Sequence, residues 1–215
     1  MVSRPPWAGP EVLVVTVGRV DTSGVRAAYL NNQLLVAMPA LADPNFAQSV
    51  ALVCEHTAKG ALGIVINRPL DNMALGDVLD QLSLETRHAG LRGQPVLRGG
   101  PVQQDRGFVL HPPGGPKDGE WDSTLQVSPT LHVTTSRDIL GSMARGEGPA
   151  NAVVALGYAG WDAGQLEEEI RSNAWLNVPV DDAIIFATPF DQRWQAALKL
   201  LGLDAGRLSH PAGHA

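Results

Sequence analysis

The sequence has very little cysteine and no long apolar run. Its one cysteine among 215 residues, Cys54, excludes a disulfide within the chain and suits a reducing compartment. No apolar stretch approaches the ~20 residues that a membrane-spanning helix needs. The N-terminal region also lacks the basic start and long apolar centre of a secretion signal. We therefore expect a cytoplasmic protein without membrane contact.

Positive charge is also scarce, because the sequence has 16 basic and 22 acidic side chains and a net charge of −6. Binding to DNA without sequence specificity requires a basic face that neutralises phosphates. Helix-turn-helix spacing, a zinc-finger pattern and a basic helix are all missing from the sequence. We expect no direct contact with nucleic acid.

Complete catalytic and cofactor motifs are missing as well. The sequence contains no GxSxG, no P-loop, no GxGxxG, no CxxC and no HExxH. A zinc site would need about four ligands, and Cys54 and His56 would have to recruit His111 or His132 from distant segments. We expect no bound metal and no cofactor.

The composition that remains is that of an ordinary globular protein, with 44% apolar and 18% charged residues. Apolar runs predict strands over residues 34–39, 50–54, 62–67, 95–99, 108–110, 125–127, 131–134, 153–156 and 183–187. Helical periodicity predicts helices over residues 75–82 and 136–144, a third after Asp162, and a fourth from Thr188-Pro189 to Gly202. Because some strands follow each other directly and others are joined through helices, we expect an α/β (mixed α+β) fold with a central mixed sheet flanked by helices.

The proline-containing residues 1–29 predict a mobile N-terminal extension, and residues 30–215 predict a single domain. Glu167 to Glu169 are expected on the solvent face of their helix.

Cys54, Glu55 and His56 form the first candidate site. Alternate residues of a strand share a face, so we expect Cys54 and His56 to point the same way and Glu55 the opposite way. One interpretation is a thiol activated by His56, as in a thiol-dependent enzyme or a redox sensor. The other is a buried structural cysteine, which the four apolar residues before it favour.

Residues at the ends of predicted strands form a second set of candidates. Backbone N–H groups at such corners can hold anions, and ligand sites of mixed sheets gather at strand ends. Arg68 could bind a carboxylate or phosphate, or form an internal salt bridge. The alternative for the glycines is that they permit tight turns, with the aromatic side chains packing on the sheet. The ligand-binding candidates are Asn67, Arg68, Gly99, Gly100, Thr135, Ser136, Arg137, Gly157, Tyr158 and Trp161.

Several segments resemble the YqgE/AlgH family of bacterial proteins, in the same order along the chain. They include DPNFAQSVALVCEH, GALGIVINRPL, PVLRGGPV, LGYAGWDAGQLEEEI, IIFATP and a closing AGHA. The resemblance covers nearly everything from about Leu30 to Ala215, and it implies a central sheet with surrounding helices and a smaller inserted lobe. One branch of the family carries the label of transcriptional regulator.

The resemblance brings no established activity with it. Since no catalytic motif is complete, we expect a non-enzymatic regulatory or binding protein with an unknown protein or small-ligand partner. The alternatives are a thiol-dependent enzyme or redox sensor that uses Cys54, and a transcriptional regulator that acts indirectly. The match of the AGHA tail suggests that the tail docks on the body of the protein or on a partner.

Overall fold

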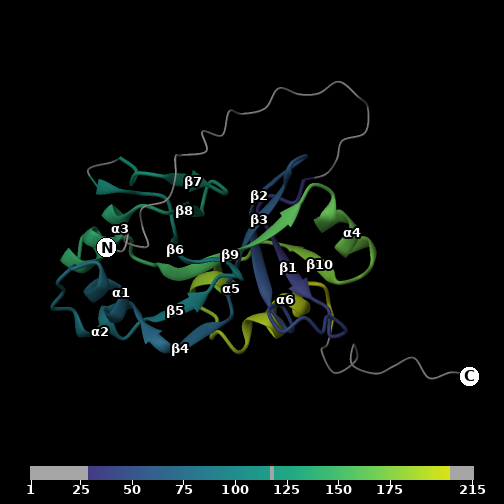
Figure 1. The fold of residues 1–215 in the computed structure, drawn as a ribbon, viewed down its shortest axis with the longest axis horizontal. Helices are drawn as coiled ribbons and strands as arrows, with labels where there is room; N and C mark the ends of the chain where they lie inside the picture. Colours follow the sequence, from purple (N-terminus) through teal and green to yellow (C-terminus); the bar gives the residue numbers. More distant parts are fainter. Residues whose placement is uncertain (1–28, 117–118, 204–215) are drawn as a thin grey trace, which may run out of the picture.

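A computed structural model describes residues 29–116 and 119–203 of the chain, and these form one ten-stranded sheet with six helices (Figure 1). The strands are β1 Gln33–Ala37, β2 Val50–Thr57, β3 Gly60–Val65, β4 Pro69–Ala74, β5 Pro95–Arg98, β6 Val102–His111, β7 Thr124–Gln126, β8 His132–Thr134, β9 Val153–Asp162 and β10 Trp175–Pro179. The helices are α1 Leu75–Gln81, α2 Ala89–Arg92, α3 Arg137–Arg145, α4 Gln165–Arg171, α5 Asp182–Phe186 and α6 Arg193–Leu200.

Strand β9 joins the two halves of the sheet (Figure 1). The order along the sheet is β10-β1-β2-β3-β9-β6-β8-β7, and β5 pairs with both β4 and β9. The pairing of β5 with β9 is parallel, whereas the other pairings are antiparallel. The sheet is therefore mixed, as the sequence predicts. The inserted lobe that the resemblance implies stays a prediction.

The sheet curls around its main core. One cluster of buried side chains joins Leu34 and Leu52 of one half to Phe108 and Leu110 of the other. Helices α5 and α6 complete the same cluster, for example through Trp194, whose indole N–H donates to the carbonyl oxygen of Ala37 at 2.9 Å. Both halves of the sheet thus bury one face against the same two helices.

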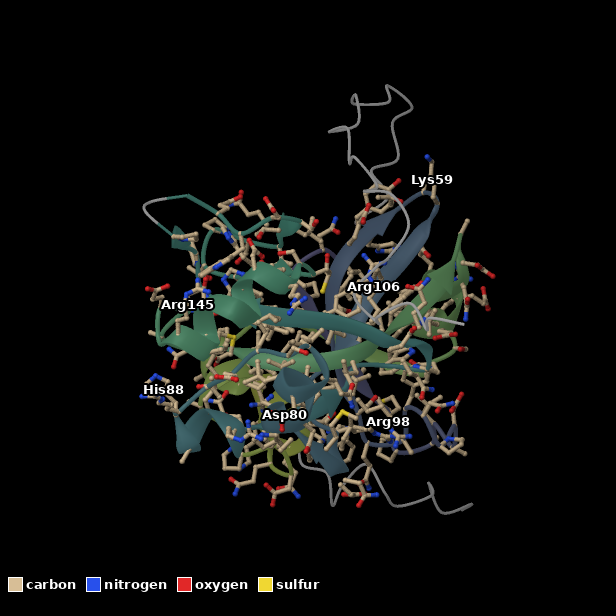
Figure 2. The ribbon with its side chains drawn as sticks, turned by 60° about the vertical axis from the view of Figure 1, so that its left-hand side comes forward. Lys59, Asp80, His88, Arg98, Arg106 and Arg145 are labelled. Carbon is tan, nitrogen blue, oxygen red and sulfur yellow. The ribbon has the colours of Figure 1, made fainter. Side chains whose placement is uncertain are left out.

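The outer face of the sheet carries two separate clusters. Helices α1 and α3 pack over Val96, Val109 and Val154 in one half. Helix α4 packs over the other half, where Trp161 and Trp175 lie among Ala51 and Val53. The labelled charged side chains lie at separate places on the surface, with Lys59 at the tip of the β2–β3 hairpin (Figure 2).

The strand predicted over residues 183–187 is wrong, because this segment is helix α5. A short apolar run is equally compatible with a buried strand and with a buried helical turn. Asp181 decides the outcome, since its side chain accepts a hydrogen bond from the backbone N–H of Ala183 at 2.8 Å and so caps the helix. Strands β4 and β10 were not predicted, and α6 begins at Arg193, after Pro189.

The predicted extension up to residue 28 and the AGHA tail lie outside the described residues. Among the helices that are described, none combines the length and the apolar character needed to span a membrane.

Candidate functional site

The Cys54 thiol lies in the main core and is 4% exposed. Its Sγ atom lies 3.7 Å from the carbonyl oxygen of Leu52. Burial, with a smaller contribution from the charge of Glu55, raises the pKa of the thiol far above its usual range. Since the thiolate is the nucleophile, the interpretation of Cys54 as a reactive or redox-sensing thiol is not supported.

The expectation that Cys54 and His56 share a face is also wrong, because β2 has a bulge at Cys54. Val53 pairs with Gly63 and Glu55 pairs with Leu62, so Cys54 has no partner on β3. An extra residue in one strand exchanges the two faces beyond it. Cys54 therefore points into the main core, whereas His56 lies on the outer face, where α4 packs.

His56 connects the start of the described chain to helix α4. Its Nδ1 atom accepts a hydrogen bond from the backbone N–H of Leu30 at 3.0 Å, so the ring proton is on Nε2. Nε2 lies 3.1 Å from Oε1 of Glu167, and Tyr29 contacts the ring edge-to-face. Both ring nitrogens are thus engaged, and neither is available to a thiol.

Asn67 and Arg68 hold the turn that precedes β2. The Asn67 side chain accepts from the N–H of Val50 at 2.8 Å and donates to the carbonyl oxygen of Gln48 at 2.9 Å. The Arg68 guanidinium donates to the carbonyl oxygens of Pro44 and Ala47. Partial burial, and then the nearby charge of Arg98, lower the pKa of Arg68. The Arg68 N–H groups thus bind backbone carbonyl oxygens of this turn. Among the described residues, Arg68 makes no salt bridge.

The glycines at residues 99, 100 and 157 mark a close approach of two backbone segments. A Cβ atom on Gly99 would lie 2.2 Å from the carbonyl oxygen of Gly157, and one on Gly100 would lie 2.1 Å from the carbonyl carbon of Tyr158. Gly157 itself has a φ of +74°, a conformation that side chains disfavour. Residues 157–161 lie inside β9, so the prediction that they form a corner after a strand is wrong.

The aromatic side chains that follow Gly157 pack on the sheet. Tyr158 meets Phe108 edge-to-face at 5.9 Å between ring centroids. The Trp161 indole N–H donates to Oε2 of Glu169 at 2.8 Å, and the Trp175 indole N–H donates to the same oxygen at 2.8 Å. The expectation that this acidic cluster faces solvent is therefore wrong for Glu167 and Glu169, which turn toward the sheet.

Thr135 and Ser136 lie between β8 and α3 and Arg137 begins α3, at the strand-to-helix corner that the sequence predicts. Their side chains are engaged within the chain. Thr135 Oγ1 donates to the carbonyl oxygen of Ser123, Ser136 donates to the Asp138 carboxylate, and Arg137 donates to the carbonyl oxygen of Leu82. The N-cap residue of α3 is Ser136. Thr135 and Arg137 thus connect the start of α3 to the backbone of Ser123 and Leu82.

The two histidines considered as distant metal ligands lie side by side on β6 and β8. The rings of His111 and His132 are 5.9 Å apart between centroids, and Nε2 of His111 lies 2.8 Å from Oγ1 of Thr134. Desolvation lowers the pKa of His111. Across residues 29–116 and 119–203, no group of three or more His, Cys, Asp or Glu side chains comes close enough to hold a metal ion.

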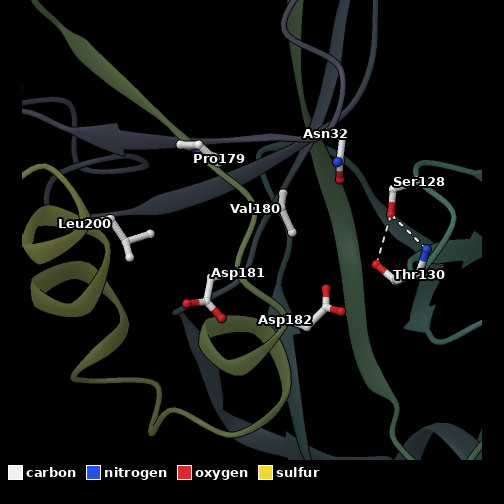
Figure 3. Close-up of a pocket in the computed structure, with 8 residues that line it drawn as sticks. All are labelled: Asn32, Ser128, Thr130, Pro179, Val180, Asp181, Asp182 and Leu200. Carbon is white, nitrogen blue, oxygen red and sulfur yellow. Dashed lines mark hydrogen bonds between the residues drawn. The ribbon is translucent and has the colours of Figure 1, made fainter.

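A pocket of about 480 Å³ opens where the two ends of the curled sheet approach each other (Figure 3). One side is the connection between β7 and β8, and the other is the corner from β10 into α5. In Figure 3 the Asn32 carboxamide and the Asp182 carboxylate turn toward one another across the pocket. The lining residues are Asn32, Ser128, Thr130, Pro179, Val180, Asp181, Asp182 and Leu200.

None of the lining residues was among the candidates from the sequence, because they come from four separate segments. The available signal was weak. Asp181-Asp182 precede an apolar run and could have been recognised as a helix start. The partner segment, around Ser128-Pro129, reads only as a turn.

The fold and these contacts define a mixed α/β protein with a buried thiol and a curled sheet that opens onto a polar pocket. The family model described as AlgH-like matches residues 34–206. The chain therefore belongs to the AlgH-like family.

Two relatives are similar to this chain over most of its length. UPF0301 protein Tgr7_2910 of Thioalkalivibrio sulfidiphilus is 56% identical over 189 residues, which are 88% of this chain and 98% of that protein. UPF0301 protein xcc-b100_1413 of Xanthomonas campestris is 51% identical over 186 residues, which are 86% of this chain and 96% of that protein. The names of these two relatives state no activity.

The solution structure of the AlgH protein from Pseudomonas aeruginosa is similar to this chain with a TM-score of 0.71 and 45% identity, over 90% of this chain and 100% of that one. The crystal structure of protein DIP2367 from Corynebacterium diphtheriae has a TM-score of 0.65 at 21% identity, over 85% of this chain and 92% of that one. The second likeness shows the fold alone.

Proposed function

We propose that the protein is a non-enzymatic binding protein that takes its ligand in the pocket between the β7–β8 connection and the β10–α5 corner. The observation that carries the proposal is this pocket, whose walls bring polar side chains from both ends of the sheet to one space. Ligand sites are typically concave and combine apolar walls with a few placed polar groups. Pro179, Val180 and Leu200 supply the apolar wall here.

The state of the other candidates supports binding over catalysis. Cys54 is buried, His56 is engaged at both ring nitrogens, and Arg68 is engaged with backbone carbonyls. A nucleophile and its base must lie within hydrogen-bond reach of each other, and the bulge turns Cys54 and His56 to opposite faces. An indirect influence on transcription would follow from binding a regulatory partner, and it stays a prediction.

A screen of small molecules by backbone NMR tests the proposal. The library contains cationic, neutral and anionic compounds, and binding is followed at the amides of the lining residues. The variant Thr130→Trp places a large side chain at an exposed wall position. The control Ala58→Trp places the same side chain in the exposed turn of the β2–β3 hairpin, which Lys59 marks in Figure 2.

We expect compounds that shift the lining amides of the native chain and of Ala58→Trp, and much weaker shifts in Thr130→Trp. The proposal is wrong if no compound binds with a dissociation constant below about 1 mM, which corresponds to about −4 kcal/mol. It is also wrong if binding is the same in Thr130→Trp.

A further inference from the structure

We propose that this pocket recognises an alkylammonium or alkylguanidinium group, that is, a positively charged group on a short apolar stem. The inference rests on the proposed function and names the class of ligand. It starts from the polar groups of the pocket, which are predominantly acceptors of hydrogen bonds. Asn32, Asp181 and Asp182 contribute carbonyl or carboxylate oxygens, and Ser128 and Thr130 contribute hydroxyls.

The Asn32 side chain shows that one acceptor lacks a donor. Its Oδ1 atom is buried and has no hydrogen-bond partner within the described residues. Asn32 has a φ of +58°, in the left-handed region, which fixes the direction in which its side chain leaves the backbone. A buried acceptor without a partner costs free energy, so a ligand that donates an N–H group to it gains more than it would at a solvated oxygen.

The charges around the pocket favour a cation. Among the residues that the structure describes, the lining contains two carboxylates and no Lys, Arg or His side chain. Neither Asp181 nor Asp182 takes part in a salt bridge among the described residues. One oxygen of Asp181 accepts from the N–H of Ala183, and the exposed Asp182 carboxylate faces the pocket (Figure 3). An ammonium or guanidinium group placed between Asp182 and Asn32 would meet both a charge and an acceptor without a donor.

The remaining wall is apolar and suits an alkyl stem. Pro179 and Val180 lie at the end of β10, and the half-exposed Leu200 ends α6. Lysine and arginine side chains behave in this way, because their methylene stems lie along apolar surface while the charged head meets polar groups. A bare metal ion fits the pocket less well, because only two carboxylates line it and the described residues contain no group of three or more His, Cys, Asp or Glu side chains that could hold a metal ion.

Titration calorimetry and NMR with agmatine test the class of ligand, with butyramide as a neutral probe and butyrate as an anionic probe. A second pair of probes is the peptide acetyl-Gly-Arg-Gly-amide and its citrulline counterpart, which replaces the guanidinium by a neutral urea. Binding of agmatine, of the arginine peptide or of both supports the inference. Which of them binds tells whether the cation comes from a small molecule or from a protein side chain.

Variants of the wall test the recognition itself. Asp182→Asn should weaken agmatine binding by about threefold to fivefold, the size expected for the loss of one exposed ion pair. Asp71→Asn removes the same charge from an exposed residue outside the pocket and should leave binding unchanged. Asn32→Asp keeps the shape of the side chain and adds a charge, so it should strengthen binding. Added salt should weaken binding to the native chain.

Two results separate this inference from the proposed function. In the first result, butyramide or the citrulline peptide binds as tightly as its charged counterpart, and Thr130→Trp abolishes that binding. The pocket then binds a ligand without distinguishing its charge, so only the inference is overturned. If the cationic probes bind equally to the native chain and to Thr130→Trp, they bind elsewhere; the inference is then overturned, and the proposed function is overturned with it if no neutral or anionic compound of the screen binds in the pocket. If no cationic probe binds, the inference is overturned whatever the neutral and anionic probes do.

Discussion

Replacement of Glu169 should destabilise the protein strongly although the residue is only half-buried. Its Oε2 atom accepts the indole N–H groups of Trp161 and Trp175, each at 2.8 Å, and its Oε1 atom accepts from Gln165 at 2.8 Å. The two indoles are 6% and 2% exposed, so few other partners can reach them. The variant Glu169→Leu removes the acceptor and leaves both indole donors without a partner.

The magnitude follows from the cost of a buried donor that lacks a partner, about 1–3 kcal/mol each. For two indoles, with water able to reach the half-buried position of Glu169, we expect a loss of about 2–4 kcal/mol in the free energy of unfolding. In a chain of this size 1 kcal/mol shifts Tm by about 2–4 °C, so Tm should fall by roughly 5–15 °C. Glu169→Gln keeps one oxygen without the charge and should lie between the native chain and Glu169→Leu.

Urea unfolding followed by tryptophan fluorescence measures this loss. Glu168→Leu is the matched control, because Glu168 lies on the same helix, is exposed and pairs with Arg171 at the surface. It should change the free energy of unfolding by less than about 1 kcal/mol. Equal stabilities of Glu169→Leu and Glu168→Leu would refute the reasoning, since the indole hydrogen bonds would then contribute nothing.

Two further results are expected. Cys54 should not react with an aromatic disulfide reagent at pH 8 in the folded protein, and it should react fully in denaturant, because the thiol is buried; fast reaction of the folded protein would contradict its burial. Burial lowers the pKa of folded His111, so the unfolded chain takes up a proton first as the pH falls below ~6.5. Stability that is present above that pH is then lost toward lower pH. The free energy of unfolding should therefore fall more steeply between pH 7 and pH 5 in the native chain than in His111→Gln, whereas equal slopes would argue against the lowered pKa.

The sequence predicts the strands of the main core well, because long apolar runs have few other interpretations. Val50 to Cys54 and Leu62 to Val65 are strands in the structure. The boundaries fail where a strand contains glycine. Gly157 and Gly160 suggest a corner, but β9 continues through them because Gly157 permits the close approach of Gly100. Such an approach depends on a segment more than fifty residues away along the chain and leaves no local signal.

The candidate site was harder to predict for a related reason. Strand alternation gives the correct face for Leu52 and Cys54 and the wrong face for His56, because a single extra residue in β2 exchanges the faces beyond it. Helical periodicity likewise misses Glu169, whose partners are two indoles on β9 and β10, strands that are not adjacent in the sheet. The pocket consists of four segments that meet only in the folded chain, and neither composition nor spacing brings them together.

The central place of β9 has a consequence for the order in which the protein is made. β9 begins at residue 153, yet it supplies partners to β3, β5 and β6, which lie between residues 60 and 111. During synthesis these earlier strands leave the ribosome with unpaired edges, which are prone to pair with other chains. One edge of β1 stays unpaired for longer still, because its partner β10 begins at residue 175. A chain that stops before residue 153 therefore exposes the edges of half a sheet, and we expect it to aggregate or to be held by chaperones until β9 is complete.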